Sequence, residues 1–416
     1  MYMSNMPKFP AETSRSRYLT QEQTQQFAKE LEALRDNIMA KVGEEDSNYI
    51  RSVARKVRNS EIAGRTLLGT LGWLPPAWLA GVALLSFSKI VDNMELGHNV
   101  MHGQFDFMND PKFSGANFEW DNACAGPLWK HYHNYMHHTY TNILGKDHDV
   151  GYNLVRMSPE QAWGPSDLFN LPKTVALALL FQWAVGYHDI QVSVDEYKDD
   201  PQLNQIMKSK TRTMLKKMGR QFGKDYLFFP AISTVNFIPA LTGNLTANVA
   251  RNVWSWGIIF CGHFTAEAEM FENNIENETR GEWYIRQIKG SSNITGGKFF
   301  HFMTGNLSHQ IEHHVFPDMS SLRYQELAPQ LKSLCEKYGI NYNTGSLSKQ
   351  LSEVMIRIAK YSVPSKKDLR EYRQAKIEHK ERQYQIEPAK LFIKGMGLGL
   401  KDAIPNFIKN PIKFMF

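Results

Sequence analysis

The sequence predicts an all-α integral membrane protein, with about four transmembrane helices in two hairpins and a helical cytosolic cap that holds a metal site. Two stretches without a charged residue, 66–88 and 226–250, contain 23 and 25 residues. A membrane-spanning helix needs about 20 mostly apolar residues, so both stretches are long enough. Nine of the 14 histidines fall in three short segments, which indicates a shared site.

Prolines near the middle of each uncharged stretch favour hairpins over single spans. Pro75 and Pro76 interrupt the first stretch and Pro239 the second, and the apolar segment 255–266 follows the second. Basic residues precede both stretches, so both hairpins should begin and end in the cytoplasm. In the alternative, each stretch is one span and residues 171–187 form another crossing. That segment has only 14 uncharged residues after Lys173, so we expect an embedded or interfacial helix there.

The remaining segments are expected to be cytosolic helices. Residues 20–42 predict an amphipathic helix that begins at Thr20, with Gln23 completing a capping box. Further helices are expected over 322–338, ending at Gly339, and over 365–383. The tail, 389–416, either lies on the membrane surface or packs against the cap. The expected division is N-terminal helices over 1–60, a membrane domain over 61–345 and a helical C-terminal region over 346–416.

The cysteine content and the distribution of charge limit the kinds of metal site and partner that the sequence predicts. Three cysteines without CxxC spacing fit a reduced, cytosol-facing protein and exclude a cysteine-based zinc site. Residues 208–224 contain seven basic side chains and no acidic one. This run favours an anionic contact, such as lipid headgroups, a nucleotide-bearing substrate or an acidic partner protein, or it is a solvated face that sets membrane orientation. We expect no nucleic-acid partner, and the first residues contain no cleavable signal peptide.

The three histidine-rich segments are GHNVMH, KHYHNYMHH and SHQIEHH. Residues i and i+4 share one face of a helix, so each segment can direct two imidazoles at a common point. Adjacent histidines diverge by about a quarter turn, which suits two neighbouring metal ions. Imidazole binds iron, copper, nickel and zinc. The i and i+4 pairs are His98 with His102, His133 with His137, and His309 with His313.

GHNVMH, HNYMHH and HQIEHHVFP resemble the three histidine boxes of the membrane fatty acyl desaturases, most closely the branch with acyl-CoA and front-end desaturases. The resemblance covers residues 66–345 and is closest to bacterial acyl-CoA or linoleoyl-CoA desaturases. It implies a mushroom-like fold with a cytosolic diiron centre held by histidine. The ligands that it implies are His98, His102, His133, His137, His138, His313 and His314, with His263 at the cytoplasmic end of the last membrane segment as a further ligand.

Other polar residues near these boxes are candidates for metal binding or for support of the ligands. The family pattern has histidine or glutamine at the place of Gln310, so His309 is one residue away from it. His148, which lies between Asp147 and Asp149, is expected to orient an imidazole. Asp149 is a candidate for metal binding or for the same support, since ligating histidines usually donate their other N–H to a carboxylate or a carbonyl. Glu312 could act in the same way, Asn306 could hold a water near the metal, and His131 is expected to play a supporting or surface role. His188 is expected to be structural.

The resemblance implies an oxygen-dependent desaturase that inserts a cis double bond into a long-chain acyl group, carried by coenzyme A or by a phospholipid. Two iron ions and O2 would take part. This chain has no His-Pro-Gly-Gly heme motif, so the two electrons are expected from a separate ferredoxin, cytochrome b5 or flavoprotein reductase. The alternatives are a diiron alkyl or lipid hydroxylase and a non-enzymatic membrane metal-binding protein. The active site and both termini are expected to face the cytoplasm of a bacterial inner membrane.

Overall fold

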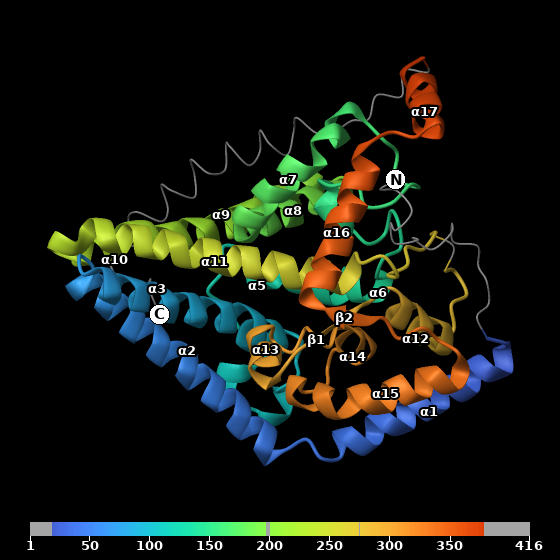
Figure 1. Cartoon of the computed structure of the whole chain (residues 1–416), viewed down its shortest axis with the longest axis horizontal. Helices are drawn as coiled ribbons and strands as arrows, with labels where there is room; N and C mark the ends of the chain where they lie inside the picture. The colour runs from blue at the N-terminus through green and yellow to red at the C-terminus, as the bar shows by residue number, and fades with distance from the viewer. Residues whose placement is uncertain (1–18, 197–199, 274, 378–416) are drawn as a thin grey trace, which may run out of the picture.

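The computed structural model describes residues 19–196, 200–273 and 275–377 (Figure 1). Their fold is all-α, as predicted, apart from one short pair of parallel strands, β1 (Asn293–Thr295) and β2 (Thr344–Ser346). The strand pair was not expected, because three-residue strands carry no periodic signal in the sequence.

The first predicted hairpin consists of α2 (Glu44–Leu71) and α3 (Pro75–Val91), which pack side by side. The prolines begin α3 instead of interrupting a helix, since the first turn of a helix needs no N–H from proline. The two helices approach closely at Gly64, where an added Cβ would lie 2.9 Å from the carbonyl oxygen of Gly81. Helix α2 also runs without a break through residue 60, and the domain division expected there stays a prediction.

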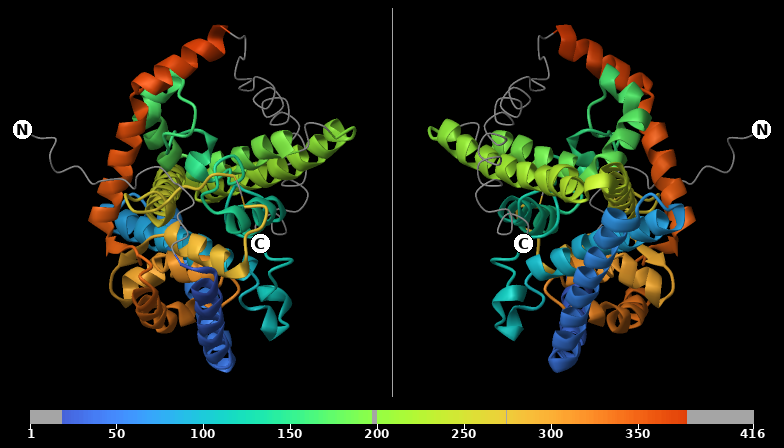
Figure 2. Two further views of the ribbon diagram at one scale, coloured as in Figure 1. Left: turned by 90° about the vertical axis from the view of Figure 1, so that its right-hand side faces the viewer. Right: turned by 90° about the vertical axis from the view of Figure 1, so that its left-hand side faces the viewer.

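The second hairpin consists of α9 (Leu203–Phe222), the π-helical η7 (Gly223–Phe228) and α10 (Phe229–Ile232), followed by α11 (Phe237–His263). The chain reverses at η8 (Thr234–Asn236), just before Pro239. Helix α11 is central and contacts α3 on one side and α7 (Asn170–Leu179) and α8 (Phe181–Glu196) on the other (Figures 1 and 2). The two hairpin tips meet where Trp73 Nε1 donates to the carbonyl oxygen of Val235 at 2.7 Å.

Among the described residues, no single helix is both long enough and apolar enough to cross a membrane. One pair reaches that length and composition when taken together, Pro165–Leu179 with Phe181–Ser193, but its two parts meet at 107°. The helix expected over 171–187 is therefore two helices, α7 (Asn170–Leu179) and α8 (Phe181–Glu196), which are separated at Leu180. The bend follows no proline or glycine, so the sequence contains no local signal for it.

The first two of the three predicted cap helices pack against each other on the opposite side of the molecule from the hairpin tips (Figure 1). Helix α1 (Gln21–Met39) begins with the predicted capping box of Thr20 and Gln23. Helix α15 (Tyr324–Tyr338) ends at Gly339, whose φ of 65° is a left-handed conformation that suits glycine. The tail 389–416 and the end of the helix expected over 365–383 lie outside the described residues; within them, α17 covers Lys366–Ile377.

The remaining elements surround the centre of the molecule. In the first half they are η1 (Asp92–His98), α4 (Asn99–Met101), η2 (Asp106–Met108), η3 (Pro111–Phe113), α5 (Gly126–Trp129), η4 (Lys130–His137), α6 (His138–Tyr140), η5 (Val150–Asn153) and η6 (Pro165–Phe169). In the second half they are α12 (Arg280–Lys289), α13 (Lys298–Met303), α14 (Gln310–Val315), η9 (Ser321–Arg323) and α16 (Leu347–Ser362).

Candidate metal centre

Four separate segments bring histidines to one place in the interior. Two of these segments are π-helical: η1 ends at His98, and η4 contains His133 and His137. π-helical turns are rare and often occur at functional sites. Helix α11 contributes its last residue, His263, and α14 contributes the third histidine segment.

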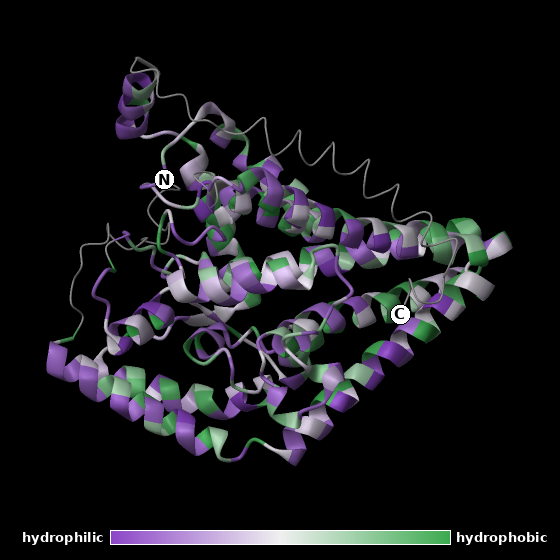
Figure 3. Cartoon of the chain, turned by 180° about the vertical axis from the view of Figure 1, so that it is seen from behind, coloured by the Kyte–Doolittle hydropathy of each residue, from purple (hydrophilic) through white to green (hydrophobic). Residues whose placement is uncertain are grey.

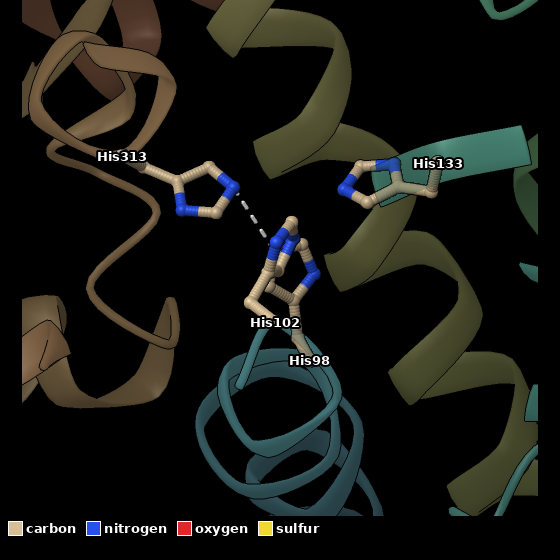
Figure 4. A group of neighbouring side chains, drawn as sticks. All are labelled: His98, His102, His133 and His313. Carbon is tan, nitrogen blue, oxygen red and sulfur yellow. Dashed lines mark hydrogen bonds between the residues drawn. The ribbon is translucent and has the colours of Figure 1, made fainter. Parts of the chain in front are cut away.

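The imidazoles form three overlapping groups, in each of which the ligand atoms lie within 4.8 Å of one another. Figure 4 shows the first group, in which the rings of η1, η4 and α14 point toward one another. In this group the Nε2 atoms of His98 and His313 are 3.2 Å apart. The groups are His98, His102, His133 and His313; His137, His263 and His314; and His138, His313 and His314. Because the third group shares His313 with the first and His314 with the second, the arrangement offers two adjacent sets of nitrogen ligands.

Several of these rings turn their Nδ1 atoms outward to protein acceptors or hydroxyl groups. His137 Nδ1 lies 3.0 Å from Asp147 Oδ2, and His314 Nδ1 lies 3.0 Å from Gln287 Oε1. His313 Nδ1 lies 3.2 Å from the hydroxyl oxygen of Tyr324. A proton on Nδ1 leaves the lone pair on Nε2, which is the atom that faces the group.

The protonation state of most of the imidazole rings is the one that metal binding requires. Burial, and then the neighbouring imidazoles, lowers the pKa of His98, His102, His138, His313 and His314 well below the ordinary histidine range, so these rings are neutral and their lone pairs are available. Burial alone would also lower the pKa of His137, but Asp147 outweighs it and raises that pKa. Within the described residues, the Nε2 atoms of His102, His133, His138 and His314 are buried and have no hydrogen-bond partner. Buried polar atoms without partners are rare, and a transition metal would satisfy them together.

Comparison with known proteins decides the family. Residues 72–346 match the model of the fatty acid desaturase family. The chain is 40% identical over 356 residues to the NADPH-dependent stearoyl-CoA 9-desaturase of Mycobacterium tuberculosis, a match that covers 84% of this chain and 82% of that protein. The chain belongs to the fatty acid desaturase family.

Other desaturases are similar to this chain at lower identity. The sn-1 linoleoyl-lipid 6-desaturase of Synechocystis is 26% identical over 278 residues, which cover 64% of this chain and 75% of that protein. The human fatty acid desaturase 3 is 24% identical over 302 residues, which cover 71% of this chain and 63% of that protein.

Two aspartates of the desaturase contact the imidazoles of the second box, and one of them, the candidate Asp149, forms a further possible ligand group with His133 and His137. Asp147 accepts the hydrogen bond from His137, and Asp149 Oδ2 lies 3.6 Å from His133 Nδ1. The ring of His148 lies instead near the side chain of Asn153, at 3.5 Å. His188, which was expected to be structural, is 3.4 Å from Asp149 Oδ1 and so extends the contacts behind His133.

Gln310 contacts a proposed ligand directly. Its Nε2 lies 2.9 Å from His263 Nε2, and its Oε1 is buried without a partner among the described residues. His263 Nδ1 lies 3.2 Å from the carbonyl oxygen of Gly290. The structure thus places Gln310 among the rings of the second group.

The other candidates of the desaturase have partners outside the three groups. The ring of His309 stacks on that of His301 at 4.5 Å, and burial, then His301, lowers the pKa of His309 to about 3. Glu312 accepts from Asn293 at 2.8 Å and from Tyr342 at 2.7 Å, and its Oε2 lies 3.9 Å from His309. The remaining two have the following partners: Asn306 donates to Glu95 and accepts from Gln325, and His131 lies 3.0 Å from Glu196.

The residues that follow the second box, Thr141 and Asn142, support the centre of the desaturase, which sequence analysis did not foresee. Thr141 Oγ1 donates to Gln287 Oε1 at 2.8 Å and lies 3.2 Å from His314 Nδ1. Asn142, in a left-handed conformation with φ of 58°, donates its side-chain amide to the carbonyl oxygens of Glu269 and Gly290. Asn142 therefore joins the second box to residues before and after α12. Asparagine adopts positive φ more readily than most residues, and this was the signal available in the sequence.

A pocket of about 750 Å³ opens at the surface of the desaturase and reaches His138. It is open to solvent between α1 and α12, and His138 forms part of its lining. The lining also contains aromatic and charged side chains, with Trp283, Tyr284 and Phe316 as the aromatic residues and Arg35, Arg280, Glu32, Asp36 and Asp318 as the charged ones.

Proposed function

We propose that this protein is an oxygen-dependent fatty acyl-CoA desaturase that introduces a cis double bond with two histidine-bound iron ions and two external electrons. The observation that carries the proposal is the convergence of eight imidazoles in two adjacent sets, in a chain that belongs to the desaturase family. The reaction takes two hydrogens from adjacent methylenes and uses one O2, two electrons and two protons to give two waters.

The proposed ligands are the eight histidines of the three groups: His98, His102, His133, His137, His138, His263, His313 and His314. Iron bound there would supply oxygen activation, which amino-acid side chains cannot perform on an unactivated methylene. The protein's part is to keep Nε2 facing inward by directing the Nδ1–H groups of His137 and His314 to the acceptor oxygens of Asp147 and Gln287. Six of these eight rings are buried, which excludes bulk water from the reaction site.

An acyl-CoA substrate is supported by the more similar relative. That relative is named a stearoyl-CoA desaturase and is 40% identical, whereas the lipid-linked desaturase of Synechocystis is 26% identical. The same name, NADPH-dependent, supports electron supply from NADPH through a separate ferredoxin, cytochrome b5 or flavoprotein reductase.

We also propose that the hairpin tips enter the cytoplasmic membrane while the metal centre and both termini face the cytoplasm. Hydrophobic residues occur at both tips (Figure 3), and several large apolar side chains there are exposed, as is typical of a membrane or protein contact. Among them, Trp73 is 63% exposed and Val235 is 79% exposed. The others are Leu71, Leu74, Leu79, Ile232, Phe237 and Ile238.

The test uses purified, iron-loaded protein in detergent or lipid nanodiscs with stearoyl-CoA, O2, NADPH and a ferredoxin with its reductase. We expect a monounsaturated acyl product, identified by mass spectrometry after derivatisation, and about two iron ions per chain. His313→Ala should lose the product and iron, and Lys332→Ala, on the exposed face of α15, is the matched control that should retain both.

Each other result has a defined meaning. A hydroxylated acyl product would identify a hydroxylase, and absence of any oxygen-dependent product with stearoyl-CoA, palmitoyl-CoA and a phospholipid would favour a metal-binding protein without this activity. Unsaturation of the phospholipid alone would overturn the acyl-CoA assignment.

A further inference from the structure

A second cluster of charged side chains lies between the two hairpins, apart from the histidines. At its centre is Asp225 of η7, whose side chain is fully buried. Its carboxylate accepts from Arg65 of α2 at 2.9 Å, from Lys89 of α3 at 2.7 Å and from Asn248 of α11 at 2.9 Å. One carboxylate therefore connects three helices with the π-helical segment on which it lies.

Asp121, in the loop before α5, is the second centre of this cluster. It accepts from Lys89 at 3.0 Å and from Gln221 at 2.6 Å, and it also pairs with Lys224. Lys89 thus bridges the two aspartates. We call the set formed by Arg65, Lys89, Asn93, Asp121, Lys224, Asp225, Asn248 and Arg251 the hairpin charge cluster.

Arg251 of α11 connects this cluster to the first histidine box. Its Nη1 donates to the carbonyl oxygen of Asp121 at 3.0 Å and to Asn93 Oδ1 at 3.2 Å. Asn93 belongs to η1 and precedes His98 by five residues. The amide of Asn93 also donates to the carbonyl oxygen of Asp121 at 3.0 Å.

The cluster consequently holds three of the four segments that deliver histidines. It contacts η1, which leads to His98; the loop at Asp121, which leads through α5 to His133; and α11, which ends at His263. No chemistry of the metal centre needs these charges, and their pairing among themselves leaves the cluster without need of a ligand.

The ion pairs of the hairpin charge cluster contribute more to the specificity of helix alignment than to the stability of the fold. The desolvation of buried ion pairs offsets most of their attraction, so an apolar replacement of the whole cluster would be about as stable. Removing one partner is costly, however, because an uncompensated charge stays buried. A shift of α3 or α11 along its neighbour would have the same effect, so the cluster allows only one axial alignment of the helices.

We infer that Asp225 and Arg251 are positioning residues that set the relative placement of the histidine-bearing segments and thereby the geometry of the proposed dimetal centre. The inference rests on the proposed function, because it needs a metal at the histidines. It assigns to the hairpins a role in catalysis in addition to their packing.

The experiment compares Asp225→Asn with Leu68→Ala in the full chain, using cobalt(II) as the metal probe. Leu68 is 1% exposed and packs between the same helices in an apolar part of the interface, so its truncation loosens the hairpins without breaking an ion pair. We expect Asp225→Asn to weaken cobalt binding about tenfold and to change the cobalt visible absorption bands. Leu68→Ala should lower the Tm but leave those bands unchanged, and Asp225→Glu should restore part of the affinity.

Asn93→Leu provides a second variant should Asp225→Asn fail to fold. It removes the amide between Arg251 and η1 while leaving the ion pairs of Asp225 in place, and we expect the same altered cobalt bands. Unchanged bands in the folded Asp225 or Asn93 variant, or identical changes in Leu68→Ala, would overturn the inference. Because cobalt binding needs neither oxygen nor substrate, wild type that binds cobalt but does not desaturate would refute only the proposed function. A wild type that binds no cobalt would refute both.

Discussion

Asp147 controls the orientation of His137, because both carboxylate oxygens lie within 3.1 Å of the ring Nδ1. Replacement of Asp147 by asparagine keeps the shape but removes the charge that stabilises the Nδ1 proton. We expect iron affinity or desaturation rate to fall by about 10- to 100-fold, as for other residues that hold metal-binding histidines. Iron content and initial rates measure the two effects.

His148→Asn is the matched control for this prediction, since His148 is adjacent in the chain and its ring faces Asn153. It should leave iron affinity and rate near those of wild type. Equal losses in both variants would show that the loop conformation, not the Asp147 carboxylate, supports the centre.

Glu95 gives the protein a pH-dependent contribution to stability. Burial raises the pKa of this carboxyl from its ordinary 4.5 to about 7, although Ser321, Tyr49 and Asn306 hydrogen-bond to it. The folded state therefore binds a proton that the unfolded chain releases above pH 4.5. This contribution is complete below pH 4.5 and is lost as the pH rises toward 7.

The variant Glu95→Gln cannot ionise, so its Tm relative to wild type should rise between pH 5 and pH 7.5. Thermal unfolding followed by tryptophan fluorescence, at matched ionic strength, measures this difference. The other titrating groups are common to both proteins and cancel. A Tm difference that stays constant across this range would contradict the raised pKa.

The residues of the candidate site could be predicted from their spacing alone only where a motif repeats. The histidines were found because their spacing is periodic and dense. Gln287 and Tyr324, which hold Nδ1 atoms of the third box, belong to other helices and have no shared spacing with it. Tertiary packing alone brings them to the centre, so no local pattern could identify them.

Helices α2 and α3 form the first hairpin through a close backbone approach at Gly64. A methyl group there would meet both the carbonyl oxygen of Gly81 and the amide nitrogen of Leu85 at 2.9 Å. We expect Gly64→Ala to destabilise the protein by about 1 to 3 kcal/mol, as overpacking of an interior does. Chemical unfolding of the detergent-solubilised protein measures this cost.

Gly257→Ala on α11 is the matched control, because an added Cβ there meets nothing within 4 Å. Alanine is the better helix former, so this change should be neutral or stabilising by up to about 1 kcal/mol. Destabilisation of similar size in both variants would show that the two helices are not in close contact.

Among the helices, the sequence predicts the features that depend on local composition and misses those that depend on packing between helices. The uncharged stretches and their prolines correctly indicated two helical hairpins, and Thr20 and Gly339 correctly marked helix ends. The three π-helical segments and the bend at Leu180 have no compositional marker. Contacts with other helices offset the energetic cost of this irregular geometry, and a local sequence pattern does not reveal such contacts.

For the whole molecule, metal binding and folding should be linked. The proposed ligands come from segments between His98 and His314, and only the folded chain brings them together. A ligand that binds only the folded state stabilises it by about 2.7 kcal/mol at 100 times its Kd. Removal of iron by a chelator should therefore lower the Tm by several degrees, and readdition of iron(II) should restore it.

His102→Ala is a useful comparison for the chelation experiment, because it removes one proposed ligand with a partly exposed side chain. The Tm of this variant should respond less to the chelator than that of wild type. If chelation leaves the Tm of wild type unchanged while removing bound iron, the metal does not link these segments.

The π-helical segments η1 and η4 also determine how the chain tolerates length changes. Each residue of an α-helix turns the next by about 100° and each residue of a π-helical turn by somewhat less, so a deletion inside η1, such as that of Met94, would change the direction of His98 and His102 together relative to α3. Their mutual spacing and every side chain of the box would survive, yet the pair would face another direction. The geometry of the centre thus depends on the number of residues between α3 and the histidines as much as on residue type. Relatives would have to preserve this number even where their residues differ.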